Sequence, residues 1–263
     1  MKILVTGSSG FIGKNLVANL RTNKDNEVFE FDIGNTEKDL EKYCSECDFV
    51  FHLAGVNRPT KNEEFITGNF DFTVKVLNKL KKADNHCPIV FASSIQAKLD
   101  NEYGKSKLKA EELLKKYSQE VNAKVFFYRL SNVFGKWSRP NYNSVVATFC
   151  HNIQNDLPIK INDENTELLL TYIDDVVESF VDCLNFESDE KFLFREIEKA
   201  NRISLGELAK VLFDFKYCQD SNYIPKNFYR KTRSVRCWRF YSCRNRNRRI
   251  IAIGWFGGWN EQE

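Results

Sequence analysis

The stretch KILVTGSSGFIG, residues 2–13, places a short apolar run directly before three glycines with the spacing GxxGxxG. The apolar run predicts a strand over residues 2–6, and the spacing of the apolar residues that follow predicts a helix over residues 11–20. Glycines between a strand and a helix allow a tight turn and bring backbone N–H groups up to a pyrophosphate. We therefore expect a dinucleotide-binding turn with cofactor contacts from Gly7, Ser9, Gly10, Phe11, Ile12 and Gly13.

Strand and helix patterns alternate beyond this turn. Apolar periodicity predicts strands over residues 28–31, 49–53, 89–92 and 125–130, and helices over residues 65–80 and 103–117. Alternation of this kind implies parallel strands joined by right-handed crossovers. The predicted fold class is therefore α/β, a doubly wound parallel sheet of the Rossmann type. Helices near residues 143–154, 174–185 and 205–214 predict a small, mostly helical substrate-binding lobe.

The composition changes near residue 217. Residues 217–263 contain two lysines and eight arginines against three acidic residues, a net charge of +7, so the first 216 residues carry −4 of the chain's total of +3. Three of the four tryptophans also lie there, and the segment has no clear helix or strand period. We predict one domain over residues 1–216, including the lobe, and a basic, aromatic tail over residues 217–263.

Composition excludes other classes of protein. The chain is 42% hydrophobic and 29% charged, as in ordinary globular proteins, and no apolar run approaches the length of a membrane span. Its eight cysteines are scattered without a secretory context, which favours reduced thiols and a cytoplasmic protein. The CxxC at Cys44 and Cys47 lacks a second ligand pair at a compatible spacing, so we predict no metal site.

Asp32 ends the second predicted strand, 25 residues after Gly7. An acidic residue at this place accepts hydrogen bonds from the adenosine ribose of NAD and repels the 2′-phosphate of NADP. No arginine follows in the loop, Ile33-Gly34-Asn35, so the residues favour NADH over NADPH.

Tyr103 and Lys107 have the spacing YxxxK and open the helix after the strand that ends in Ser93-Ser94. Helix positions i and i+4 share one face, so the phenol and the ammonium are expected side by side. A nearby cation lowers the pKa of a phenol, and Tyr103 could then act as acid and base at a carbonyl or alcohol. Ser94 would hydrogen-bond the same oxygen. The predicted catalytic residues are Ser94, Tyr103 and Lys107.

These motifs together resemble an extended short-chain dehydrogenase/reductase of the NAD-dependent epimerase/dehydratase family. The resemblance covers residues 1 to about 216, and the strings RLSNVFG at 129–135 and YIDDV at 172–176 are similar to later motifs of its sugar-nucleotide branch. Three further strings resemble the reductase domain of CapF-type capsular polysaccharide enzymes: HLAGVNRP at 52–59, SSIQA at 93–97, and FGKW at 134–137 followed by PNYNSV at 140–145.

The resemblance implies NAD(P)H-dependent reduction of the C4 ketone of a UDP-2-acetamido-2,6-dideoxy-hexos-4-ulose, on the route to UDP-N-acetyl-L-fucosamine for capsule or surface polysaccharide. It implies that Lys107 holds the nicotinamide ribose and that Asn69 supports Lys107 through ordered water. The remaining implied contacts are Leu53, Ala54 and Gly55 at the cofactor, Asn132 at the substrate diphosphate, and Arg58, Lys136 and Asn143 in the sugar-nucleotide pocket. Arg58 and Lys136 are equally compatible with solvated loop cations.

Two features depart from the CapF pattern. CapF-type enzymes are expected to prefer NADPH, which disagrees with Asp32. They also continue into a metal-binding cupin domain credited with an epimerisation step, whereas the residues after 216 contain no histidine. We interpret the tail as the truncated or frame-shifted remnant of such a domain, and we expect reduction without epimerisation.

Alternative functions remain open. A 4-epimerase on the same fold has similar residues, whereas a dehydratase would need carboxylates where Ile95 and Gln96 follow Ser94. The arginine-rich, aromatic tail also has the composition of a nucleic-acid-binding segment, although an intact Ser, Tyr and Lys set would be superfluous there. The favoured partner is a UDP-sugar; a homodimer is compatible with the sequence, and a membrane or nucleic-acid partner is not favoured.

Overall fold

The computed structural model describes residues 1–59, 61, 63–221, 238–245 and 248–255. The chain divides into two compact units, each made of two stretches: Met1–Ser131 with Ile173–Lys199, and Asn132–Tyr172 with Ala200–Glu263. Helix α8 (Leu205–Ser221) runs across the domain boundary predicted at residue 216, which stays a prediction. Most of the predicted tail, and with it the remnant hypothesis and the nucleic-acid alternative, lies outside the described residues.

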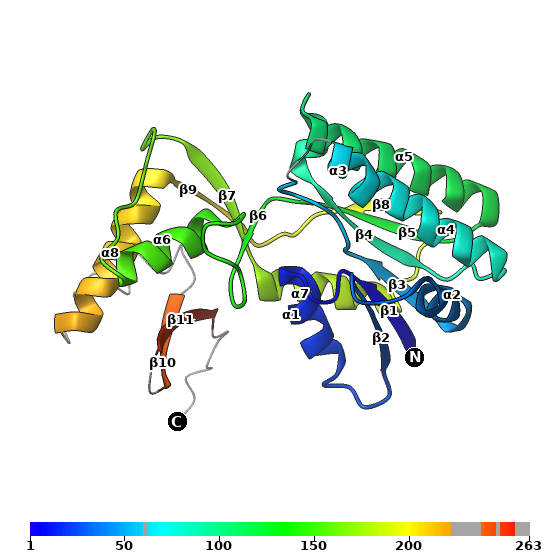
Figure 1. The fold of residues 1–263 in the computed structure, drawn as a ribbon, viewed down its shortest axis with the longest axis horizontal. Helices are drawn as coiled ribbons and strands as arrows, with labels where there is room; N and C mark the ends of the chain where they lie inside the picture. The colour runs from blue at the N-terminus through cyan, green and yellow to red at the C-terminus, as the bar shows by residue number, and fades with distance from the viewer. Residues whose placement is uncertain (60, 62, 222–237, 246–247, 256–263) are drawn as a thin grey trace. The chain divides into compact units, whose positions relative to one another are not determined.

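The first unit is built on a six-stranded parallel sheet (Figure 1). Its strands lie in the order β2-β1-β3-β4-β5-β8, so the direction of winding reverses between β1 and β3. The bounds are β1 (Lys2–Thr6), β2 (Glu27–Phe31), β3 (Phe49–His52), β4 (Ile89–Ser94), β5 (Val125–Leu130) and β8 (Phe192–Arg195). The predicted doubly wound parallel sheet is confirmed, and its switch point is the place where such sheets bind ligands.

Helices cover both faces of this sheet. On one face α1 (Phe11–Leu20) packs against α7 (Ile173–Asp182), and on the other α2 (Glu37–Glu46), α4 (Phe72–Lys82) and α5 (Glu102–Val121) pack in a row. Two of them begin at side-chain caps. Thr36 and Asp39 form a reciprocal capping box at α2, and Asn101 accepts a hydrogen bond from the Gly104 N–H at α5.

The helix predicted over residues 65–80 is interrupted. The structure has a short turn α3 (Glu63–Phe65), a π-helical segment η1 (Ile66–Asp71) and then α4. The Thr73 hydroxyl donates to the carbonyl of Asn69 at 2.6 Å, inside the widened segment. Short π-helical segments are frequent at functional sites, and this one places Asn69 at the buried end of the helix.

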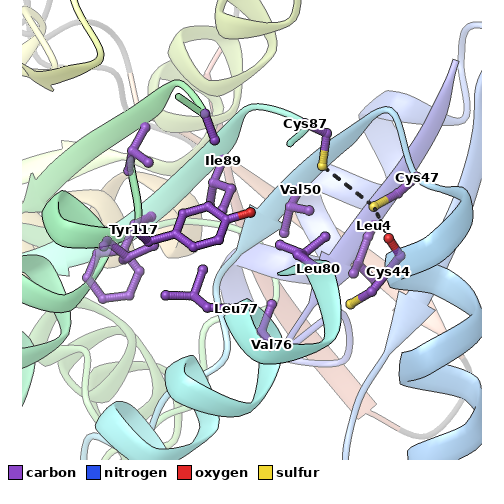
Figure 2. Close-up of a cluster of buried hydrophobic side chains, with 14 of the residues drawn as sticks. Leu4, Cys44, Cys47, Val50, Val76, Leu77, Leu80, Cys87, Ile89 and Tyr117 are labelled. Carbon is purple, nitrogen blue, oxygen red and sulfur yellow. Dashed lines mark hydrogen bonds between the residues drawn. The ribbon is translucent and has the colours of Figure 1, made fainter. Parts of the chain in front are cut away.

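The core has two sides because successive strand residues point to opposite faces. Val50 belongs to the cluster under α2, α4 and α5, whereas its neighbour Phe51 stacks on Phe180 of α7 at 6.1 Å between ring centroids. Figure 2 shows the first of these clusters, where the Sγ atoms of Cys47 and Cys87 point toward each other at 3.8 Å among aliphatic side chains. Strands buried on both faces explain the nearly continuous apolar runs of the sequence.

The second unit contains a three-stranded mixed sheet, although the sequence predicts a mostly helical lobe. Its strands lie in the order β6-β7-β9, with β6 (Asn132–Phe134) parallel and β9 (Ala200–Ser204) antiparallel to β7 (Glu167–Tyr172). Helix α6 (Val145–Gln154) packs against α8. Strand β6 has only three residues and β9 carries polar residues, so neither shows the apolar runs that identify the sheet of the first unit.

The structure has four further elements. The 3-10 turns η2 (Ile95–Lys98) and η3 (Cys183–Asn185) belong to the first unit. Strands β10 (Trp238–Asn245) and β11 (Arg248–Trp255) pair antiparallel in a stretch where the sequence shows no strand period. No helix in the described part of the chain combines the length and the apolar character that crossing a bilayer requires.

Candidate functional site

The glycine-rich turn lies between β1 and α1, at the switch point of the sheet. Gly7 has φ +72°, and a Cβ atom there would lie 2.8 Å from the backbone of Ala54. A Cβ on Gly13 would lie 2.1 Å from the Gly7 carbonyl oxygen. Only glycine fits either position, since one needs a left-handed backbone and the other a close approach. The turn leads into the first turn of α1, where Phe11 and Ile12 lie.

Asp32 follows β2 and ties the end of that strand to the turn. One carboxylate oxygen accepts the Ser9 N–H at 2.7 Å, and the other accepts the Ile33 N–H at 2.8 Å. The half-buried carboxylate therefore has a fixed position beside the glycines, and Ile33 after it is fully exposed. A carboxylate at this place fits the ribose hydroxyls of a dinucleotide.

The end of β3 lies beside the same turn. The N–H groups of Leu53 and Ala54 donate to the carbonyl and the side-chain oxygen of Thr6, at 3.2 and 3.3 Å. A Cβ on the next residue, Gly55, would lie 2.6 Å from Asn69 Oδ1 and 3.0 Å from Lys107 Nζ. Gly55 thus marks the point where Asn69 and Lys107 approach the strand end.

The side-chain amide of Asn69 is hydrogen-bonded to other groups of the protein. Its Oδ1 accepts the Val56 N–H at 2.9 Å, and its Nδ2 donates to the Val56 carbonyl and to the Ser106 hydroxyl, both at 3.0 Å. Ser106 in turn donates to the carbonyl of Tyr103 at 2.7 Å. Asn69 therefore connects the loop after β3 to the first turn of α5.

His52 is held as a neutral ring inside a chain of buried hydroxyls. The Thr73 hydroxyl already donates to Asn69, so it accepts from His52 Nε2–H at 2.9 Å, and His52 Nδ1 accepts from the Thr6 hydroxyl at 2.8 Å. Burial, with a smaller contribution from the nearby Lys107 charge, lowers the pKa of His52 to about 3. The ring is a structural link between β1 and η1.

Three predicted catalytic residues come together in the first unit. Ser94 ends β4, Tyr103 lies in the first turn of α5, and hydrogen bonds join the Tyr103 phenol to the side chains of Ser94 and Asn57. Lys107 is one turn further along α5. Its ammonium donates to the Ala92 carbonyl at 3.0 Å and lies 5.1 Å from the centre of the Phe91 ring.

The pKa of Tyr103 differs from the expected direction. Burial raises the pKa of the phenol above its usual range, and the hydrogen bonds with Ser94 and Asn57 offset only part of this effect. Burial also lowers the pKa of Lys107 to about 8, against the opposing effect of Glu111. The sequence-based expectation of a phenol pKa lowered by Lys107 is wrong for this structure because spacing along a helix does not report desolvation.

Glu111, which lies one turn beyond Lys107, was not among the predicted site residues. This carboxylate is fully buried and accepts the Ser93 hydroxyl at 2.5 Å and two N–H groups of Arg129 at 2.9 and 2.6 Å. Asn57 was also outside the predicted set. An acidic residue four positions after the lysine of YxxxK was a usable signal for Glu111, whereas Asn57 lies in a loop without a comparable pattern.

Four residues were predicted as contacts of the sugar nucleotide. Arg58 is exposed in the loop after β3. Asn132, Lys136 and Asn143 belong to the second unit, where Asn132 and Asn143 are exposed and Lys136 is half-buried. Their predicted contacts with a sugar nucleotide stay predictions. Among the described residues, no group of three or more His, Cys, Asp or Glu side chains is placed to hold a metal.

Comparison with known proteins agrees with this geometry. The family model described as "NAD dependent epimerase/dehydratase family" matches residues 3–192. A UDP-2-acetamido-2,6-beta-L-arabino-hexul-4-ose reductase of Pseudomonas aeruginosa is 45% identical over 84% of this chain and 59% of its own length. The structure of the capsular polysaccharide assembling protein CapF from Staphylococcus aureus is similar with a TM-score of 0.77 and 36% identity, over 89% of this chain and 63% of that one.

A more distant structure shares the fold. UDP-glucuronic acid 4-epimerase from Bacillus cereus, solved in complex with NAD, has a TM-score of 0.74 at 22% identity, over 82% of this chain and 85% of that one. The chain spans about three fifths of the length of the reductase and of CapF.

Proposed function

The chain belongs to the NAD dependent epimerase/dehydratase family, and from this premise we propose that it reduces the C4 ketone of a UDP-2-acetamido-2,6-dideoxy-hexos-4-ulose with NAD(P)H. The observation that supports this reaction most directly is the phenol of Tyr103, hydrogen-bonded to Ser94 with Lys107 one helical turn away. The 45% identity to a reductase of such a sugar nucleotide supports the substrate class.

The residues of the first unit fit a bound dinucleotide. The turn at Gly7 and Gly13 has no room for a Cβ, and the carboxylate of Asp32 is fixed beside it. In our proposal Gly7, Ser9, Gly10, Phe11, Ile12 and Gly13 hold the pyrophosphate region, with Leu53, Ala54 and Gly55 along the strand end. When bound, NAD(P)H supplies a hydride to the ketone carbon.

The chain's own groups handle the oxygen of the ketone. In our proposal the Tyr103 hydroxyl donates its proton to the oxygen at C4, and Ser94 orients that oxygen through a hydrogen bond. Lys107 holds the nicotinamide ribose with its ammonium, and Asn69 keeps the loop after β3 and the start of α5 together. Asn132, Arg58, Lys136 and Asn143 are proposed contacts of the UDP-sugar. The product belongs on the route to UDP-N-acetyl-L-fucosamine for capsule or surface polysaccharide.

We further propose that NADH serves at least as well as NADPH. The carboxylate of Asp32 would face the 2′-phosphate of NADPH with like charge, and Ile33, Gly34 and Asn35 offer no cation to offset it. Fluorescence titration with both cofactors tests this point. A clear preference for NADPH would contradict it and direct attention to Lys14 or Lys38 as the phosphate ligand.

Turnover is tested by following the oxidation of NADH and of NADPH in the presence of the UDP-linked 4-keto sugar, with the sugar product identified by NMR. The expected result is stoichiometric cofactor oxidation and a C4 alcohol. Inversion of a UDP-hexose without net cofactor oxidation would instead establish a 4-epimerase.

A further inference from the structure

The buried ion pair of Glu111 and Arg129 lies beside the proposed catalytic residues and has no part in the reaction proposed above. Glu111 side-chain atoms are 0% exposed, whereas those of Arg129 are 23% exposed. Two Arg129 N–H groups and the Ser93 hydroxyl donate to the carboxylate. The carboxylate thus holds β4 and β5 together at the strand end that carries Ser94.

The same carboxylate lies one helical turn from Lys107 on α5. Burial disfavours the charged form of Lys107, and Glu111 opposes that effect. His52 on β3, which feels the Lys107 charge, stays deprotonated because of its burial, and the phenol of Tyr103, one turn before Lys107 on α5, stays protonated. Arg129 on β5, whose side chain is 23% exposed, carries a positive charge that is paired with the Glu111 carboxylate.

We propose that Glu111 is a positioning residue: its buried carboxylate keeps the Lys107 ammonium charged for the cofactor and, through Ser93, fixes the strand end that presents Ser94. This inference rests on the proposed function, because it takes Lys107 as the group that holds the nicotinamide ribose. It assigns to Glu111 no contact with substrate or cofactor.

The test is the pH dependence of NADH affinity in the full chain, measured by fluorescence titration between pH 6 and 10. Wild-type affinity should fall as Lys107 loses its proton. In Glu111→Gln the same fall should occur at a pH lower by about one unit, so that affinity between the two transitions is weaker by up to about tenfold. Glu112→Gln is the matched control, since Glu112 is the exposed neighbour on the same helix. Its transition should coincide with that of wild type.

Two further variants keep the test decisive. If Glu111→Gln does not fold, Glu111→Asp should shift the transition in the same direction by a smaller amount, because the charge is retracted rather than removed. Lys107→Met should abolish the transition. Coincident transitions in wild type and in the Glu111 variants, or a transition that persists in Lys107→Met, would overturn the inference.

Cofactor binding separates this inference from the proposed function. A wild-type protein that binds NADH but leaves the 4-keto sugar nucleotide unreduced would refute the proposed reaction, while the shift between Glu111→Gln and Glu112→Gln would still decide the role of Glu111. Where turnover is present, the pH profile of kcat/KM should shift in parallel with affinity.

Discussion

Tyr103 has its phenol hydrogen-bonded to Ser94 and Asn57, so a single oxygen atom carries its proposed chemistry. Tyr103→Phe should lower kcat about a hundredfold or more and leave the Kd of the cofactor nearly unchanged, because the ring stays and only the proton donor is lost. Steady-state kinetics and cofactor titration measure the two quantities. Tyr43→Phe, which keeps a ring stacked on Phe29 outside the site, is the control and should be fully active.

The lowered pKa of His52 predicts that the folded protein loses stability as the pH falls. Its pKa is about 3 in the folded protein and 6.5 when unperturbed, so between these values only the unfolded chain binds the extra proton. The stabilisation is complete above pH 6.5 and is lost as the pH falls toward 3. Between pH 6.5 and 5 the loss is about 2 kcal/mol of unfolding free energy.

Urea unfolding at several pH values measures this loss. His52→Gln should be less stable than wild type at pH 7, and the difference between the two proteins should shrink on acidification to pH 5. His151→Gln changes an exposed histidine of α6 and should follow wild type throughout. A difference that stays constant with pH would show that His52 does not supply the acid sensitivity.

Individual residues were predictable where chemistry has a sequence pattern. The spacing of Tyr103 and Lys107, with a serine at the preceding strand end, identified three side chains that the fold gathers in one unit. The pKa direction of Tyr103 was not predictable, because burial depends on which distant strands surround the phenol. Asn57 was missed because its contact with Tyr103 joins a loop to a helix far along the chain, and no sequence pattern marks such a contact.

At the scale of elements, the start of α5 depends on its approach to η2. A Cβ on Gly104 would lie 2.1 Å from the Gln96 carbonyl oxygen and 2.8 Å from that of Leu99. Alanine normally favours a helix interior over glycine by about 1 kcal/mol. Here the clash should exceed this gain, because both oxygens belong to the backbone and cannot rotate away.

Gly104→Ala should therefore destabilise the protein by about 1–3 kcal/mol and also lower kcat, since Tyr103 is the adjacent residue. Urea unfolding and steady-state kinetics check the two effects. Gly34→Ala is the matched control, because a Cβ there meets nothing within 4 Å. That variant should change stability by no more than about 0.5 kcal/mol. A Gly104→Ala protein as stable as wild type would show that η2 moves to accommodate the methyl group.

Elements were predictable where buried positions give a continuous apolar run, as in the strands, or an apolar helix face, as in α1. The strands around Val50 and Val125 and helix α1 agree with the predicted ranges to within a residue or two. The prediction of a single helix over residues 65–80 was wrong at η1. The apolar period of the sequence continues through this π-helical segment, which accommodates Asn69, so the period does not reveal the interruption. Helix α2 was missed although Thr36 and Asp39 form a capping box. Most of its residues are polar and only Leu40 and Cys44 are buried, so its apolar period is weak.

For the whole molecule, the sequence predicted the doubly wound sheet but not how the chain is shared between units. The chain leaves the first unit at Asn132, forms part of the second, returns at Ile173 and leaves again at Ala200. Strand β8 has only four residues and β9 carries polar residues, so their patterns resemble loops. Their pairing depends on partners far away in the sequence, which a local period cannot reveal.

The buried cysteine thiols allow the opening of each unit to be followed by chemical labelling. Cys44, Cys47, Cys87 and Cys183 lie in the first unit and Cys150 in the second, all of them buried. Burial raises the pKa of Cys44 and of Cys150 to about 12, so few reactive thiolates exist in the folded state. Alkylation by iodoacetamide should therefore proceed at the rate at which each unit opens.

Peptide mass spectrometry resolves that alkylation site by site. Equal rates for Cys44 and Cys150 across a urea series would mean that the two units unfold as one cooperative body. Faster labelling of Cys150 would mean that the second unit opens while the sheet around the dinucleotide turn stays closed, and added NADH would then protect Cys44 far more than Cys150. Labelling of these five buried cysteines thus records which part of the protein opens first.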